Sequence, residues 1–232
     1  MHDLQKVMLE GVNISSSGTT SIPKNIYRSP KNLQECINVA LDAQKITKKS
    51  KILTVTRMTH AGGLLTQTLP AYSIGAKFKV QPFNAYTFLK DFKEYTHTFL
   101  APAQMTALMH TKGFQNADLT GKHILGGSDP VSWGMIEEFV KRGAIVQPNW
   151  GMTEIGPITI NTTFDNIDMV HEYKNKYHTG TILGDTYYCD WKIENNVLYV
   201  KGPTCVFDGW FKTNDLVKQY NGATYYQGRN PQ

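Results

Sequence analysis

The sequence predicts an α/β fold: a doubly wound, mostly parallel sheet with helices on both faces, followed by a small antiparallel β-rich unit. Up to about residue 157, apolar strand signals alternate with helices that start at caps and end at glycines. After that point, period-two alternation and two-residue turn signals dominate. Because repeated strand–helix–strand units form parallel sheets covered by helices, we expect an α/β unit over 1–157 and a barrel-like β unit over 158–232.

Helix caps and apolar runs locate the elements of the first unit. Ser29 before Pro30 is typical of a helix start, and Asp129 before Pro130 repeats the pattern. Strands are expected at 51–56, 76–80, 97–101, 122–127 and 144–149; helices are expected after Ser29, over 61–74, after Asn84, from Pro102 to Gly113 and after Asp129. In such sheets ligands bind beyond the carboxyl ends of the strands, so a site is expected just after these strands.

Turn dipeptides organise the second unit. Side chains alternate in character from Tyr187 to Glu194, a turn is expected at Asn195-Asn196, and a return strand follows. Asn221-Gly222 between two strand-like segments is a strong signal for a two-residue hairpin. Both features indicate antiparallel pairing in this part of the chain.

The composition is typical of a globular protein and excludes several classes. The 232 residues carry 24 basic and 19 acidic side chains, a net charge of +5, and 41% are hydrophobic. The densest basic stretch, 45–51, is typical of a solvated helix end and not of a nucleic-acid patch. No apolar run approaches the ~20 residues that span a bilayer, and the start lacks signal-peptide blocks. Three widely spaced cysteines exclude a full disulfide framework, so we expect a cytoplasmic chain. From the charge pattern and the apolar runs, we expect no nucleic-acid or membrane partner.

The segment 15–25 is the first candidate for chemistry. It gathers hydroxyls, one glycine and one lysine without any apolar period: Ser16, Ser17, Gly18, Thr19, Thr20 and Lys24. Small residues let backbone N–H groups approach an anion, and a lysine supplies a mobile positive charge for phosphate oxygens. The spacing is not that of a Walker A loop, and a plain linker is the alternative.

Four further segments carry candidate residues. Gly127 and Ser128 follow one strand and form a tight turn that a flat ligand could approach. Past the next strand, an aromatic ring that could stack on a base precedes a hydroxyl and a carboxylate: Trp150, Gly151, Thr153 and Glu154. Asp215 could accept hydrogen bonds from ribose hydroxyls, and Arg229 suits a phosphate or ribose edge. The alternatives are a capped turn, a core tryptophan, a solvated aspartate and a frayed terminus.

The order of these pieces resembles the adenylate-forming, or AMP-binding, superfamily of acyl- and aryl-CoA ligases, peptide-synthetase adenylation domains and luciferases. SSSGTTSIPKN resembles its phosphate loop, and NWGMTE resembles YGxTE with Trp150 in place of tyrosine. The other matches are THAGGL, LGGSDPVSWGMIEEF, GWFKTND and the closing QGR. HAGGL followed by a helix and AKFKV is most similar to the o-succinylbenzoate-CoA ligase branch.

The resemblance implies a two-step reaction with ATP, Mg²⁺ and a carboxylate, giving an acyl-adenylate that a thiol, commonly CoA, then attacks. It implies that residues 1–157 form a nucleotide-binding core and that the chain ends at the family's hinge. Residues matched to the phosphates and metal are Ser16, Ser17, Gly18, Thr19, Thr20, Lys24, Thr153 and Glu154, with Thr20 and Glu154 as Mg²⁺ ligands. Residues matched to the rest of ATP or AMP are Gly127, Ser128, Trp150, Gly151, Asp215 and Arg229. His60 would border the carboxylate substrate.

Departures from the family pattern set the remaining expectations. Ser21, Asn25 and Asn214 replace glycines, and asparagine tolerates a left-handed backbone better than serine. Compared with the family, the chain lacks an α/β layer before the phosphate loop and a mobile domain with a catalytic lysine after the hinge. We therefore expect a ligase-like enzyme with reduced or partner-dependent activity, doubtful thioester formation with CoA, and a homodimer or partner chain. The alternative is a nucleotide- or acyl-adenylate-binding module without turnover.

Overall fold

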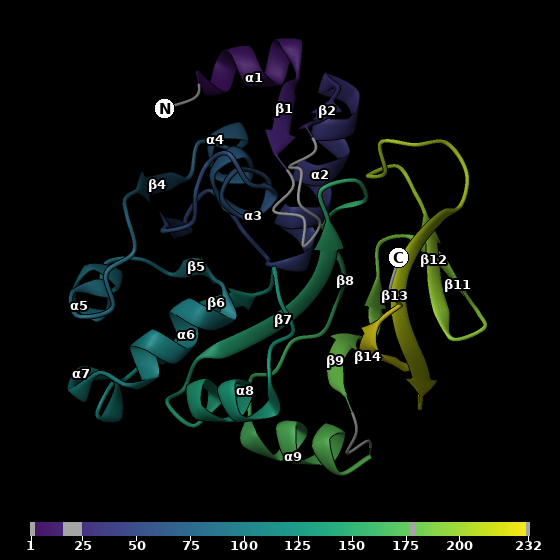
Figure 1. The fold of residues 1–232 in the computed structure, drawn as a ribbon. Helices are drawn as coiled ribbons and strands as arrows, with labels where there is room; N and C mark the ends of the chain where they lie inside the picture. Colours follow the sequence, from purple (N-terminus) through teal and green to yellow (C-terminus); the bar gives the residue numbers. More distant parts are fainter. Residues whose placement is uncertain (1–2, 16–24, 177–179, 231–232) are drawn as a thin grey trace.

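The computed structural model describes residues 3–15, 25–176 and 180–230. Two sheets dominate this part of the chain (Figure 1). The larger is a mostly parallel sheet of seven strands in the order β10-β8-β7-β6-β5-β3-β4, and the smaller is an antiparallel sheet of five. The α/β fold class with a separate β-rich unit is therefore confirmed.

The parallel part of the large sheet consists of five strands joined by helical crossovers. They are β4 (Lys77–Val80), β3 (Lys51–Thr54), β5 (His97–Leu100), β6 (His123–Gly126) and β7 (Ile145–Met152). β8 (Gly156–Asn161) and β10 (Thr186–Tyr187) then extend the sheet antiparallel. All five parallel strands present their carboxyl ends at one edge, called here the carboxyl edge; the opposite edge is the amino edge.

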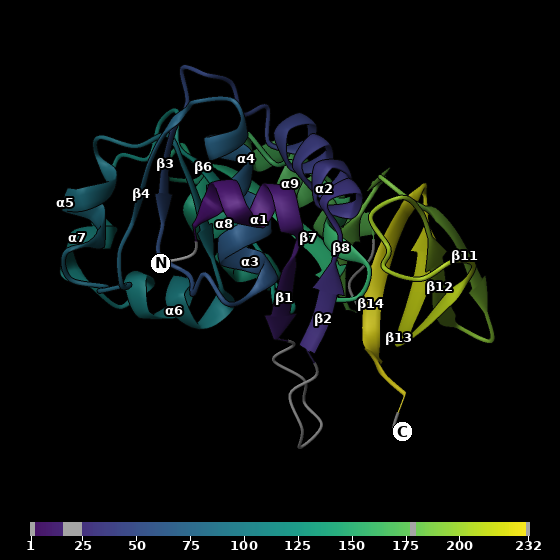
Figure 2. The same ribbon diagram turned by 90° about the horizontal axis from the view of Figure 1, so that it is seen from above.

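Helices cover both faces of this sheet, as the alternation of strand side chains requires. Leu53, Ile124 and Val146 face one side and pack against α5 (Phe88–Phe92), α6 (Pro102–Met109), α7 (Lys112–Gln115) and α8 (Trp133–Val140). Phe99 and Leu125 face the other side, which is covered by α2 (Pro30–Ala43), α3 (Ala61–Gly63), the π-helical turn η1 (Leu64–Thr68) and α4 (Leu69–Ser73). Figure 2 shows α1 (Leu4–Glu10) and α2 on this second side.

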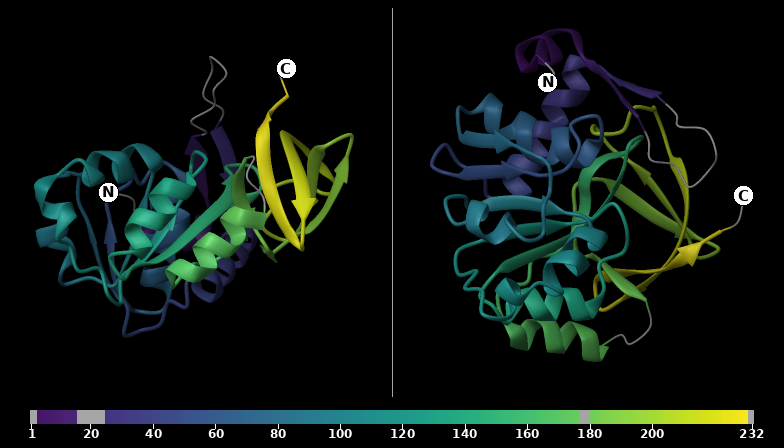
Figure 3. Two further views of the ribbon diagram at one scale, coloured as in Figure 1. Left: turned by 90° about the horizontal axis from the view of Figure 1, so that it is seen from below. Right: turned by 60° about the vertical axis from the view of Figure 1, so that its left-hand side comes forward.

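The small sheet has the order β11-β12-β13-β14-β9. Its strands are β11 (Asp190–Glu194), β12 (Val197–Lys201), β13 (Phe211–Tyr220), β14 (Ala223–Arg229) and β9 (Thr181–Gly184). It stands beside the β7–β8 side of the large sheet (Figure 3). An apolar cluster containing Trp150, Ile160, Leu198 and Val217 joins the two sheets. The expected boundary at residue 157 lies inside β8, and strands after it serve both sheets.

Several local expectations are met. Ser29 accepts a hydrogen bond from the Asn32 amide at 3.3 Å and Pro30 opens α2, so the cap is formed as predicted. Asn195 and Asn196 have φ of 51° and 63°, and Asn221 and Gly222 have φ of 48° and 84°. Positive φ at both central residues is what a type I′ hairpin turn needs.

Other expectations were wrong in detail. The helix expected after Asp129 begins at Trp133, because Ser132, not Asp129, accepts the capping hydrogen bond from the Met135 amide. The helix expected from Pro102 to Gly113 is two helices, and Gly113 lies inside the second. The helix expected directly after Asn84 starts at Phe88, after a turn in which Asn84 Oδ1 accepts from the Tyr86 amide.

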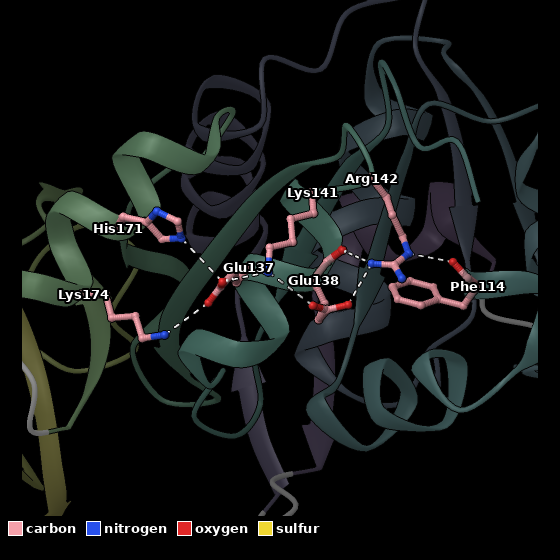
Figure 4. Close-up of polar contacts among 7 residues, drawn as sticks. All are labelled: Phe114, Glu137, Glu138, Lys141, Arg142, His171 and Lys174. Atoms are coloured by element: carbon pink, nitrogen blue, oxygen red, sulfur yellow. Dashed lines mark hydrogen bonds and ion pairs between the residues drawn. The ribbon is translucent and has the colours of Figure 1, made fainter. Parts of the chain in front are cut away.

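A helix that the sequence did not predict, α9 (Ile167–Lys176), packs along α8 on the outer face. Glu137 of α8 receives Lys141 Nζ at 2.8 Å, Lys174 Nζ at 3.2 Å and His171 Nε2 at 3.5 Å (Figure 4). The hydrogen bonds from Lys141 and Lys174 lower the pKa of Glu137 to about 2. This charge cluster fixes the two helices together and lies outside the candidate site.

Candidate functional site

Those predicted site residues that the structure describes lie at or beside the carboxyl edge of the large sheet. β1 (Val12–Ser15) and β2 (Asn25–Arg28) pair antiparallel and flank the segment 16–24, and the Ser15 hydroxyl donates to Asn25 Oδ1 at 2.9 Å. The Ser15 amide donates to the Thr59 carbonyl at 3.3 Å, which brings this hairpin beside His60. The candidates Ser16, Ser17, Gly18, Thr19, Thr20 and Lys24 lie outside the described residues, as does Ser21.

Trp150, Asp215 and Arg229 come together although they are far apart in sequence. Trp150 Nε1 donates to Asp215 Oδ2 at 2.8 Å, and Arg229 Nε lies 3.2 Å from Asp215 Oδ1. Asp215 on β13 and Arg229 on β14 are direct cross-strand neighbours, so sheet register sets this ion pair. Trp150 is 7% exposed and Asp215 6%, whereas Arg229 reaches solvent. Two polar groups from the small sheet therefore meet the last parallel strand of the large one.

Burial controls the electrostatics of Asp215. Removal from water raises the pKa of its carboxyl group, and the hydrogen bond from Trp150 and the charge of Arg229 oppose that rise. Each carboxylate oxygen has one of these partners and keeps a further acceptor site, since a carboxylate offers about four lone-pair positions. The group can thus accept additional hydrogen bonds from a ligand.

Trp150 has a packing role in addition to its hydrogen bond. Its ring lies among the apolar side chains that join the two sheets, while its N–H faces Asp215. Asn214, which precedes Asp215, has a φ of 63°, so this asparagine occupies the left-handed position expected for the glycine it replaces. Stacking of Trp150 on a base stays a prediction.

Close backbone approaches explain two predicted glycines. A Cβ on Gly127 would lie 2.5 Å from Asn149 Nδ2, whose amide donates to the Gly126 carbonyl at 2.6 Å. A Cβ on Gly151 would lie 2.4 Å from the Gly156 carbonyl oxygen, across the β7–β8 turn. Ser128, the exposed residue after Gly127, has a φ of 74°, a conformation uncommon for serine. Strained backbone of this kind is often found at binding sites.

The turn between β7 and β8 carries Thr153 and Glu154, both half-buried. Its carbonyls are bonded: Met152 O accepts from the Ile155 amide at 3.1 Å and Glu154 O from the Val206 amide at 3.0 Å. Within the described ranges, no side-chain hydrogen bond or ion pair involves Thr153 Oγ1 or the Glu154 carboxylate. Mg²⁺ usually takes one or two carboxylates together with phosphate oxygens and water, so this free carboxylate fits an Mg²⁺–phosphate ligand.

His60 lies just before α3 and is half-buried. Its carbonyl accepts from the Gly63 and Leu64 amides at 3.2 Å and 3.1 Å, while its imidazole makes no capping bond. A Cβ on Gly63 would meet the Thr56 and Arg57 carbonyl oxygens at 2.6 Å and 2.4 Å, so glycine is needed for this close turn after β3. His60 therefore stands at the same sheet edge as Gly127 and Thr153.

One buried polar residue at this edge had escaped the sequence reasoning. Arg28, the last residue of β2, is 0% exposed and its guanidinium donates to the Thr153 carbonyl at 2.6 Å. The available signal was a charged residue that ends the strand NIYR directly before a helix cap. That signal is weak, because an edge-strand arginine is ordinarily solvated.

Three further findings concern hollows, metal ligands and membrane-spanning helices. Two open hollows of about 450 Å³ and 560 Å³ flank α1, and neither is lined by a predicted site residue. No group of three or more metal-ligating side chains of the His, Cys, Asp or Glu type occurs in the ranges described. Of the helices within those ranges, none has the length and apolar character needed to cross a membrane.

Solved structures share this fold at low identity. An adenylation domain of a keto acid-selecting NRPS module bound to a keto acyl adenylate matches with a TM-score of 0.80 and 18% identity, covering 94% of this chain and 51% of that one. ATP-bound MatB from Rhodopseudomonas palustris gives a TM-score of 0.78 at 18% identity over 94% and 47% of the two chains. E. coli MenE with a bound analogue of OSB-AMS gives 0.73 at 17% identity over 94% and 47%.

Sequence comparisons point in the same direction. An indoleacetate–CoA ligase of Aromatoleum aromaticum is 33% identical over 147 residues, which are 62% of this chain and 29% of the relative. An acyl-CoA synthetase of Gibberella moniliformis is 26% identical over 151 residues, 63% of this chain and 27% of the relative. The chain thus spans less than a third of these relatives and about half of the solved structures. The model of the AMP-binding enzyme family matches residues 14–210, and the chain therefore belongs to this family of adenylate-forming enzymes.

Proposed function

We propose that the chain binds ATP with Mg²⁺, or AMP, together with a carboxylate, and forms an acyl-adenylate. The observation that carries the proposal is the convergence of Trp150 and Arg229 on Asp215, beside the turn that holds Glu154. The family is one of adenylate-forming ligases, and related folds have been solved with ATP and with an acyl adenylate.

Different residues bind different parts of the nucleotide. Asp215 and Arg229 bind the ribose hydroxyls, because a buried carboxylate with spare acceptor sites suits vicinal O–H donors. Gly127 and Ser128 border the adenine, and Trp150 and Gly151 border it on the same side. The predicted phosphate ligands are Ser16, Ser17, Gly18, Thr19, Thr20 and Lys24, and the predicted border of the carboxylate substrate is His60.

The reaction is nucleophilic displacement at the α-phosphorus. A carboxylate oxygen forms the new P–O bond while the bond to pyrophosphate breaks, and no proton is consumed. Thr153 would donate to an α-phosphate oxygen, Glu154 and Thr20 would hold Mg²⁺, and Lys24 would supply positive charge for the leaving phosphates. When bound, Mg²⁺ supplies positive charge that offsets the anionic repulsion between the reactants. Transfer of the acyl group to CoA is a further step, which this site alone does not explain.

A second copy or partner chain is proposed on the α1 side. Leu9 is 70% exposed and shares a hollow with Met8 and Tyr72, while Tyr27 is exposed across α1. Exposed apolar patches of this kind often mark protein interfaces. Sedimentation at micromolar concentration should give a mass above the 26.1 kDa of one chain, either because two copies associate or because a partner copurifies. A clean monomer would contradict this part of the proposal.

Calorimetry followed by pyrophosphate release tests the proposed function. Mg·ATP and AMP should bind, and a carboxylate panel that includes indoleacetate and keto acids should release pyrophosphate. Glu154→Gln should abolish metal-dependent binding, whereas Asp168→Asn, on the exposed start of α9, should leave it unchanged. Binding without pyrophosphate release from any carboxylate would favour the alternative of a nucleotide-binding module. Absence of nucleotide binding would reject both.

A further inference from the structure

Arg28 is a buried charge whose cost must be offset by a specific arrangement. Its side chain is fully buried at the end of β2, and burial lowers the pKa of the guanidinium. A buried ion destabilises a fold unless its donors are satisfied. The contacts of Arg28 therefore indicate what the fold gains from keeping it there.

The guanidinium bridges segments that are distant in sequence. Nη2 donates to the Thr153 carbonyl at 2.6 Å, and Nη1 donates to the Thr204 carbonyl at 2.9 Å. Nη1 also donates to Asn32 Oδ1 and lies 3.2 Å from Cys36 Sγ, both on α2. One side chain thus ties the strand after segment 16–24 to the β7–β8 turn and to the β12–β13 connection.

Asn32 extends this clamp. While its Oδ1 accepts from Arg28, its Nδ2 donates to the Pro203 carbonyl at 3.1 Å and to the Cys205 carbonyl at 3.0 Å. Three consecutive carbonyls, 203–205, are therefore held by Arg28 and Asn32 together. The next residue, Val206, donates its amide to the Glu154 carbonyl at 3.0 Å. The β12–β13 connection is in this way fixed against the turn that carries Thr153 and Glu154.

On the 153–154 turn and the 203–205 connection, the clamp bonds main-chain carbonyls and no side-chain atom. The carbonyls of Thr153 and Glu154 are both bonded, so the backbone of the turn is fixed. The Thr153 hydroxyl and Glu154 carboxylate are left for a ligand, as described above. Arginine suits this task because its planar fork reaches two carbonyls at once, whereas a lysine is a point charge on a flexible stem.

We infer that Arg28 is a positioning residue: its guanidinium fixes the 153–154 turn against the strand that follows segment 16–24, and so sets Thr153 and Glu154 relative to the phosphates of a bound nucleotide. The inference rests on the proposed function and adds to it a residue that touches no substrate. It separates the phosphate half of the site, which depends on Arg28, from the ribose half, which Asp215 and Arg229 form on other strands.

The experiment compares two ligands on Arg28→Lys. Calorimetry measures Mg·ATP, and ligand-observed NMR titration measures adenosine, which has no phosphate. We expect the Kd for Mg·ATP to rise about tenfold, as expected for a lost charged hydrogen bond, and the Kd for adenosine to change less than twofold. A purely structural role would lower the folded fraction and weaken both ligands alike. The ratio of the two affinities is therefore the readout.

Arg142 supplies a matched control (Figure 4). Its Nε donates to the Phe114 carbonyl at 2.6 Å and its Nη1 to the Glu138 carbonyl at 2.7 Å, so it also holds main-chain carbonyls. It precedes β7 and thus lies at the amino edge of the sheet. Arg142→Lys should lower the melting temperature without changing the ratio of Mg·ATP to adenosine affinity.

Three results overturn the inference, in distinguishable ways. If wild-type protein fails to bind Mg·ATP, the proposed function and the role of Arg28 fail together. If folded Arg28→Lys binds both ligands with the wild-type ratio, the role of Arg28 alone is rejected. Should Arg28→Lys fail to fold, Asn32→Ser, which removes one partner of the clamp, decides by the same ratio: a selective loss of Mg·ATP affinity supports the inference, and an unchanged ratio rejects it.

Discussion

The two edges of the large sheet both bury polar side chains, but they use them differently. At the amino edge, His97 and His123 stack with ring centroids 5.1 Å apart at the starts of β5 and β6. His97 Nε2 donates to the Gln44 carbonyl at 3.1 Å, and His123 Nε2 to Gln147 Oε1 at 2.9 Å. Gln147 Nε2 in turn donates to Asn161 Oδ1 at 2.8 Å. The polar atoms named here bond to one another or to a main-chain carbonyl, so in this sense the network is closed.

At the carboxyl edge, the buried polar groups are only partly used by the protein. Asp215 has one partner for each oxygen, and Arg28 donates to two main-chain carbonyls and to the side chains of α2 while its Nε has no partner. The Glu154 carboxylate makes no hydrogen bond or ion pair within the described ranges. A closed neutral network contributes stability and specificity. The acceptors left open at the carboxyl edge fit the proposed nucleotide site, so the comparison distinguishes residues that stabilise the fold from residues proposed for the site.

The largest expected effect is the loss of Asp215. Asp215→Ala removes the acceptor for Trp150 and for the proposed ribose hydroxyls, so the Kd for Mg·ATP should rise about 100-fold by calorimetry. The unpaired indole N–H should also lower the free energy of unfolding by about 1–3 kcal/mol in urea titrations. Asp215→Asn, which keeps an acceptor but no charge, should fall between the two proteins. An unchanged Kd in Asp215→Ala would remove the ribose role.

The amino edge should respond to pH and not to nucleotide. Burial, and the neighbouring His97, lower the pKa of His123 from 6.5 to about 4, so the unfolded chain binds a proton between these values that the folded chain does not. The free energy of unfolding should therefore fall as pH drops from about 6.5 to about 4, by up to about 3 kcal/mol. His123→Phe should reduce this slope and keep the wild-type Kd for Mg·ATP. A slope that survives in the variant would assign the pH dependence to other groups.

A moderate effect is expected at the junction of the two sheets. Trp150→Phe keeps a ring in the apolar cluster but removes the N–H that donates to Asp215. We expect a loss of about 1–2 kcal/mol in unfolding free energy, since a buried carboxylate loses one partner, and a severalfold weaker Kd for Mg·ATP. Trp150→Leu, which also removes the ring, should cost more stability. An unchanged unfolding free energy and an unchanged Kd in Trp150→Phe would deny a role to the hydrogen bond.

The smallest effect should come from Arg229. Its side chain is 42% exposed, so the ion pair with Asp215 is screened and worth little to stability. Arg229→Lys should change the melting temperature by no more than a degree or two and should weaken Mg·ATP binding only a fewfold, more clearly at low salt. A large loss of stability would show that Arg229 stabilises the fold, and would contradict its assignment to the site.

Local chemistry in the sequence predicted much of the fold. Caps, glycines and apolar runs located the parallel strands, and Asn221-Gly222 gave the β13–β14 hairpin because the turn itself requires positive φ. α9 was not predicted, because most of its residues are polar and apolar residues such as Ile167, Val170 and Tyr173 are too few to give a clear helical pattern. Ser132 replaced Asp129 as the cap, which shows that two capping residues a few positions apart leave the start of a helix ambiguous.

The site was predicted as separate turns and not as contacts. Gly127 follows β6 and Glu154 follows β7, whereas the strand expected to end at residue 149 runs on to Met152 and contains Trp150 near its end. The carboxyl-edge rule nevertheless brings these residues to one place. The bond from Trp150 to Asp215 joins residues 65 positions apart and depends on how the two sheets meet. Arg28 is harder still, because its burial arises only when α2, the 153–154 turn and the 203–205 connection close around it. Sequence patterns describe neighbours along the chain, and these contacts are tertiary.

The most direct test of convergence on one nucleotide is the indole N–H spectrum of ¹⁵N-labelled protein. The chain has four tryptophans, and Trp150→Phe and Trp133→Phe would assign two of the four signals. On addition of Mg·ATP, we expect a saturable shift of the Trp150 signal, whose N–H is bonded to Asp215, and no shift of Trp133 on the outer face. A Trp150 signal that stays in place at millimolar Mg·ATP would contradict the account.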